Sequence, residues 1–184
     1  MRELFETALA ELGSVAKRID EADVERACGM ISGAGKIVLY GCGREGLQVR
    51  GLAMRLYHLG CDVAMHGDMA APPVGGGDLF VATAGTGELA TVTALMRVAR
   101  DAGAGVLFLT AEPEAAAAKL ADFVLEIPAQ TMARDQGEAA TSVLPMGSVF
   151  EGALFLLFEV MVLRLGNIMD VSAQDMRARH TNLE

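Results

Sequence analysis

Glu151 is the carboxylate in this 184-residue sequence that is best placed to do chemistry. It follows PMGSVF and lies near the start of an apolar run at 149–165, where burial in a helix would raise its pKa. A carboxylate with a raised pKa can take a proton from a carbon beside a carbonyl and return it to the neighbouring carbon. Such a transfer moves a carbonyl group to the neighbouring carbon through an enediol without a metal or cofactor. The alternative is a carboxylate that only stabilises a helix N-terminus.

Two histidines and one arginine could assist such a base. His180 lies in the polar C-terminal stretch RARHTNLE, and His58 lies in RLYHLG. The alternatives are a frayed tail for His180 and a structural helix residue for His58. Arg44 could bind an anion or polarise a carbonyl, or it could pair with a carboxylate such as Glu45. The histidines and cysteines show no metal-ligand spacing, so we expect neither metal nor cofactor.

Two glycine-rich loops each follow an apolar segment and precede a helical pattern. The first is GCGREG at 41–46, and the second is AGTGE at 84–88. Loops at the carboxyl ends of parallel strands converge, and a Thr/Gly-rich turn that opens a helix offers N–H groups and hydroxyls to a phosphate. The alternative is that these residues only cap the helix and let it pack closely. The predicted anion site comprises Gly43, Arg44, Thr83, Gly85, Thr86, Gly87 and Glu88.

The first loop also matches the G-x-G-x-x-G pattern of dinucleotide-binding proteins. Asp62 or Asp68 lies in the range of the acid that would bind the ribose. However, the second loop has no role in that pattern, and the chain leaves little room for a substrate domain. An oxidoreductase is therefore the less favoured interpretation.

Five short segments have the near-continuous apolar character of strands buried on both faces, and helical patterns alternate with them. We therefore expect an α/β fold, a three-layer α/β/α sandwich with a five-stranded parallel sheet. The single domain, 1–184, would comprise two N-terminal helices (1–35), the sheet with its loops (36–128), and a long helix with a tail (146–184). Residues 129–145 lack a clear period and are expected to form a functional loop or a region ordered by a partner subunit. The expected strands are 36–40, 61–65, 78–83, 105–110 and 123–127.

Composition excludes some partners. The chain has 15 basic and 24 acidic residues and no Lys/Arg cluster, so we expect no nucleic acid. The apolar run 149–165 is shorter than the ~20 residues of a membrane span and carries three charged residues, so we expect no membrane insertion. Burial of this run between subunits would give a homodimer or homotetramer. Three scattered cysteines and an N-terminus without a secretory segment fit a cytoplasmic protein.

Several ordered stretches resemble one family. YGCGREGLQVRGLAMRLYHLGCDVAMHGD is similar to the first half of a sugar isomerase (SIS) domain, and GDLFVATAGTGELATV is similar to its phosphosugar loop. PMGSVFEGALFLLFE and RARHTNLE resemble the C-terminal pattern of the 6-phospho-3-hexuloisomerases. The resemblance covers 36–184 and implies a flavodoxin-like SIS architecture and a sugar phosphate as the small-molecule partner. It also implies conversion of 3-hexulose 6-phosphate to fructose 6-phosphate, with Glu151 as base and His180 reaching an active site of its own or a neighbouring subunit.

This chain departs from the family pattern in the phosphate loops. The family usually has Ser after the loop arginine, where this chain has Glu45, and its S-G-S-G-E-T becomes AGTGEL at 84–89. Of the four hydroxyl positions only Thr86 keeps a hydroxyl, and each lost hydrogen bond to a phosphate would cost ~1.5–3 kcal/mol. Two alternatives therefore stay open. One is a non-catalytic sugar-phosphate sensor, and the other is an isomerase of a different, unphosphorylated polyol whose hydroxyls donate to Glu45.

Overall fold

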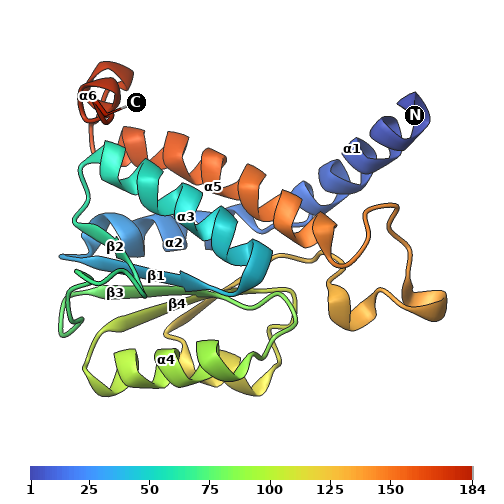
Figure 1. The fold of residues 1–184 in the computed structure, drawn as a ribbon, viewed down its shortest axis with the longest axis horizontal. Coiled ribbons are helices and arrows are strands. Elements are labelled where there is room, and N and C mark those ends of the chain that lie inside the picture. The colour runs from blue at the N-terminus through green and yellow to red at the C-terminus, as the bar shows by residue number, and fades with distance from the viewer. Residues whose placement is uncertain (184) are drawn as a thin grey trace.

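The computed structural model describes residues 1–183 and has a five-stranded parallel sheet at its centre (Figure 1). The strand order is β2-β1-β3-β4-β5, and Leu39 of β1 lies beside Met65 of β2 and Val81 of β3. The predicted α/β fold is confirmed, and each strand overlaps a predicted segment. The strands are β1 (Ile37–Gly41), β2 (Val63–Met65), β3 (Leu79–Thr83), β4 (Gly105–Thr110) and β5 (Phe123–Glu126).

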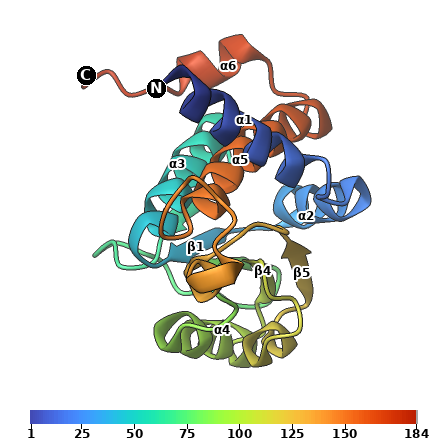
Figure 2. The same ribbon diagram turned by 90° about the vertical axis from the view of Figure 1, so that its right-hand side faces the viewer.

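Helices cover both faces of the sheet and complete the three layers (Figures 1 and 2). On one side lie α2 (Glu21–Gly33), α3 (Gly43–Leu59) and α5 (Ser148–Ile168), with α1 (Arg2–Ala16) packed against α5. On the other side lie α4 (Ala90–Asp101) and the short 3-10 helix η1 (Ala116–Leu120). The last helix, α6 (Ala173–Ala178), contacts α3.

The sheet separates two apolar cores because alternate side chains of each strand point to opposite faces. Ile37 and Leu39 join the core under α2, α3 and α5, whereas Val38 joins the core under α4. The same alternation holds for the buried residues of β3 and β4. Burial on both faces explains why these strands are continuous apolar runs in the sequence.

A close backbone approach holds α3 on the end of β1. A Cβ added at Gly46 would lie 2.5 Å from the Gly41 carbonyl oxygen, and one at Gly41 would lie 2.8 Å from the Thr83 hydroxyl oxygen. Glycine at these two positions therefore lets the first turn of α3 lie directly against the strand. At the other end, α3 stops at Gly60, whose φ of 95° places it in the left-handed region.

The long helix α5 has apolar residues on nearly all sides. Its buried residues face the core, while Phe155, Leu156, Val160 and Leu163 are exposed. Between residues 1 and 183, no helix is both long and apolar enough to cross a membrane. The segment before α5 contains only two short 3-10 helices, η2 (Met132–Arg134) and η3 (Gly137–Ala139).

Candidate active site

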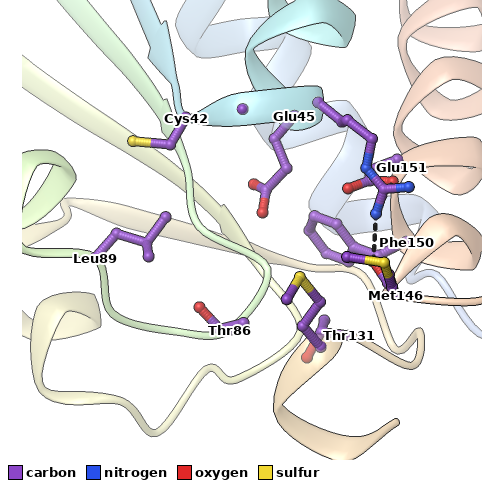
Figure 3. Close-up of a pocket in the computed structure, with 12 residues that line it drawn as sticks. Cys42, Glu45, Thr86, Leu89, Thr131, Met146, Phe150 and Glu151 are labelled. Carbon is purple, nitrogen blue, oxygen red and sulfur yellow. Dashed lines mark hydrogen bonds and ion pairs between the residues drawn. The ribbon is translucent and has the colours of Figure 1, made fainter.

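A cavity of about 310 Å³ opens at the carboxyl ends of β1 and β3, where the two predicted glycine loops meet (Figure 3). In a sheet of order 2-1-3-4-5, ligands bind at this β1/β3 switch point because the connections leave in opposite directions and a crevice forms between them. The cavity is lined by Cys42, Gly43, Arg44, Glu45, Thr86, Leu89, Thr131, Met132, Met146, Gly147, Phe150 and Glu151.

Glu151 and Arg44 form an ion pair in this cavity. Arg44 Nη2 lies 3.0 Å from Glu151 Oε2, and the Glu151 side chain is only 16% exposed. Arg44 also donates hydrogen bonds to Ser148 Oγ at 2.9 Å and to the Met146 carbonyl oxygen. Burial raises the pKa of Glu151, the positive charge of Arg44 opposes that rise, and the negative charge of Glu45 adds to it. The arrangement places a partly desolvated carboxylate beside a guanidinium, which suits proton transfer next to a carbonyl.

Glu45, in the first turn of α3, reaches across to the loop after β3. The Gly85 N–H donates to both carboxylate oxygens of Glu45, at 3.0 Å and 3.2 Å. In Figure 3 the Glu45 carboxylate points into the space above Thr86. Burial raises its pKa, and the hydrogen bond from Gly85 opposes the rise. The backbone amide that was predicted to bind an anion is therefore bound to a carboxylate of the chain itself.

The second glycine loop, 84–88, packs closely against neighbouring residues and also contributes to the cavity lining. A Cβ at Gly85 would lie 2.8 Å from the Phe150 ring, and one at Gly87, whose φ is 85°, would lie 2.6 Å from Glu112 Cβ. Thr83 is fully buried, and its hydroxyl interacts with the Glu45 carboxylate and helps to lower the pKa of that group. Glu88 is exposed and does not line the cavity. Of the predicted loop residues, Gly43, Arg44 and Thr86 line it directly.

His58 and His180 lie together, far from this cavity. Their rings stack with centroids 5.3 Å apart, and Arg179 donates a hydrogen bond to the His58 carbonyl oxygen at 3.0 Å. His58 is near the C-terminal end of α3, roughly 22 Å along the helix axis from the cavity. Figure 1 shows α6 at the opposite end of α5 from the loop that precedes it. A catalytic role for either histidine stays a prediction, and it would have to be played in the cavity of another subunit.

Several lining residues were not predicted. Thr131 and Met132 come from the segment 129–145, which lacks a clear period, and Met146 and Phe150 come from the stretch PMGSVF that precedes Glu151. Leu89 stands at a loop position where the family pattern has a hydroxyl. The one available signal was the length of the segment 129–145. Across residues 1–183, no group of three or more His, Cys, Asp or Glu residues could hold a metal ion.

The fold and the cavity place the chain among α/β proteins that have one parallel sheet between two layers of helices. In this class of protein the ligand pocket is built from the loops after β1 and β3 and, here, the first turn of α5. Within that class the chain belongs to the SIS domain family, whose model matches residues 30–157. The predicted resemblance is confirmed over nearly the whole chain.

Relatives of known name support the same placement. The chain is 34% identical to a 3-hexulose-6-phosphate isomerase of Mycobacterium gastri, over 95% of this chain and 86% of that protein. It is 31% identical to a protein of the same name from Bacillus subtilis, over 96% and 95% of the two chains. A solved structure of a Methanococcus jannaschii protein, for which the function of 3-hexulose-6-phosphate isomerase was inferred, superposes with a TM-score of 0.85. That pair is 22% identical, with 99% of each chain covered, and the likeness shows the shared fold.

Proposed function

We propose that this chain is a sugar-phosphate isomerase that interconverts 3-hexulose 6-phosphate and fructose 6-phosphate. The observation that carries the proposal is the pairing of a partly desolvated Glu151 with Arg44, 3.0 Å apart, in a cavity at the switch point of the sheet. The names of the relatives support the substrate, and a sugar phosphate is its expected small-molecule partner.

The geometry suits a one-base mechanism. Glu151 takes the proton from C2 of 3-hexulose 6-phosphate, and the electron pair of the C–H bond forms the enediolate with the carbonyl at C3. Arg44 stabilises the negative charge that develops on the oxygen. The proton then passes from Glu151 to C3, the O2 proton is transferred to O3 directly or through solvent, and the carbonyl is left at C2. Ser148 and the Met146 carbonyl hold Arg44 in place for this task.

The test is formation of fructose 6-phosphate by the wild type, Glu151→Gln and a matched control, Glu159→Gln. Glu159 lies on the same helix but pairs with Arg55, and it does not line the cavity. We expect Glu151→Gln to lose at least ~10²-fold in rate because a general base contributes about that much. We expect Glu159→Gln to keep the wild-type rate. Equal rates for wild type and Glu151→Gln would remove Glu151 from its role, and no turnover by the wild type would reject the substrate.

We also infer a homodimer or homotetramer in the cytoplasm. Exposed apolar residues on α5, and Leu4, Phe5 and Leu9 on α1, which packs against α5, are suited to burial against a second copy. Such an assembly is what could bring His180 to a neighbouring cavity. The three free cysteines fit a reducing compartment. Light scattering that gives the mass of a monomer would contradict the assembly.

A further inference from the structure

The amide of Gly85 belongs to the predicted anion loop, and it donates to both carboxylate oxygens of Glu45, at 3.0 Å and 3.2 Å. The cation of the cavity lining, Arg44, is likewise engaged with Glu151. The Gly85 amide and the Arg44 guanidinium are therefore both paired with carboxylates that belong to the chain.

Thr83, the last residue of β3, lies directly before this loop and beside Glu45. It is fully buried, and its hydroxyl interacts with the Glu45 carboxylate and helps to lower the pKa of that group. A Cβ at Gly41 would lie 2.8 Å from the Thr83 hydroxyl oxygen, so this hydroxyl lies between the two loops. The Glu45 carboxylate is therefore held in place by the Gly85 amide and by the end of β3.

The charges decide which ligand group fits beside these residues. A phosphate beside Glu45 would either lie against its carboxylate or displace it from Gly85, and the like charges lower the affinity for the phosphate relative to that for a neutral group. An ionised carboxylate can only accept hydrogen bonds, so it is complementary to a group that donates them. The terminal hydroxymethyl group of an unphosphorylated sugar is such a donor.

We propose that Glu45 is the specificity-determining residue of this cavity: its carboxylate takes the place of a phosphate on the Gly85 amide, receives the terminal hydroxyl of the sugar, and extends the isomerase to unphosphorylated ketohexoses. This inference rests on the proposed isomerase activity of the same cavity. It adds that the preference for a phosphorylated over an unphosphorylated sugar is lower than it would be with a small neutral residue at position 45.

Two variants separate this role from a merely structural one. Glu45→Gln removes the charge but keeps the length of the side chain and an oxygen that can accept from Gly85. Glu45→Ser removes the charge and also clears the space. Glu114→Gln is the control, because Glu114 is exposed and outside the cavity, so the variant changes the net charge alone. Thermal unfolding establishes that each variant is folded.

The measured quantity is the ratio of kcat/KM for fructose 6-phosphate to kcat/KM for fructose, with the 3-hexulose product followed by NMR. We expect the ratio to rise about tenfold or more in Glu45→Ser, to rise in Glu45→Gln, and to stay at the wild-type value in Glu114→Gln. A ratio that is unchanged or lower in both Glu45 variants overturns the inference.

Affinity measurements test the inference even if no isomerase activity is found. Calorimetric titration with fructose 6-phosphate and with fructose gives the same ratio as affinities. If no protein turns over either sugar, the proposed function fails, but the inference still requires Glu45→Ser to gain affinity for fructose 6-phosphate relative to fructose. Equal relative affinities in wild type and Glu45→Ser would overturn it.

Discussion

Replacing Gly46 with alanine tests whether the close contact between α3 and β1 positions the cavity. The added Cβ would lie 2.5 Å from the Gly41 carbonyl oxygen and 3.2 Å from the Gly41 carbonyl carbon. Ordinary contacts lie at ~3.5–4.0 Å, and both atoms belong to the backbone of a central strand, so the helix must move outward by about 1 Å. Overpacking of this kind costs ~1–3 kcal/mol or more, and the better helix propensity of alanine returns at most ~1 kcal/mol.

We therefore expect Gly46→Ala to lower the free energy of unfolding by about 1–2 kcal/mol, which lowers Tm by roughly 2–8 °C in a chain of this size. Because Arg44 and Glu45 move with the helix, the isomerase rate should fall by up to ~10²-fold, the usual cost of a 1 Å misplacement. Thermal unfolding followed by circular dichroism and the fructose 6-phosphate assay measure the two effects.

Gly51→Ala is the matched control on the same helix. Gly51 is exposed, and apart from its chain neighbours and the adjacent backbone of its own helix, no atom of the described residues lies within 4 Å of an added Cβ. Only the propensity gain of about 1 kcal/mol should therefore appear. A Gly46→Ala protein that is as stable and active as the wild type, next to a stabilised Gly51→Ala, would refute the reasoning.

Three further predictions concern charge, burial and assembly. Arg44→Met removes the positive charge that lowers the pKa of Glu151, so the acidic limb of the pH profile of kcat/KM should move to higher pH. A limb that moves to lower pH would contradict a role for the ion pair. Burial raises the pKa of Cys28 to about 11, so iodoacetamide at pH 8 should label Cys28 only after denaturation. Labelling of Cys28 in the native protein would show that the contact between α2 and α5 opens. Phe155→Glu places a charge on the exposed face of α5 and should reduce the mass found by light scattering, whereas an unchanged oligomer would place the subunit contact elsewhere.

Most of the sheet could be predicted from the sequence because its central strands are buried on both faces. The segment 105–110 was predicted to the residue, and 78–83 within one residue, since continuous apolar runs bounded by glycine or polar residues have few other structures open to them. The edge strand β2 is shorter than predicted, with three residues instead of five, because it pairs with β1 alone. The short helix between β4 and β5 is the 3-10 helix η1.

The cavity could be predicted only in part. The two glycine loops and Glu151 were expected to converge, and the structure brings Arg44, Thr86 and Glu151 together. The lining from Thr131, Met132 and Met146 depends on the path of a segment without periodicity, which no local pattern determines. The direction of the Glu45 side chain could not be predicted from the sequence either. A charged residue beside an anion site usually points to solvent, and only the tertiary contact with Gly85 shows that it points inward.

The first turn of α3 links the two halves of the cavity. Arg44 and Glu45 are neighbours in the sequence, yet Arg44 reaches α5 and Glu45 reaches the loop after β3. Their charges act on Glu151, the proposed base, in opposite directions, because Arg44 lowers and Glu45 raises its pKa. A change at position 45 should therefore alter the basicity of Glu151 as well as the proposed subsite for the end of the sugar. Removing the Glu45 charge should favour ionised Glu151 and extend activity to lower pH, in the direction opposite to the loss of Arg44. If the specificity ratio changed while the acidic limb stayed in place, the two carboxylates would be independent, and the subsite alone would account for the role of Glu45.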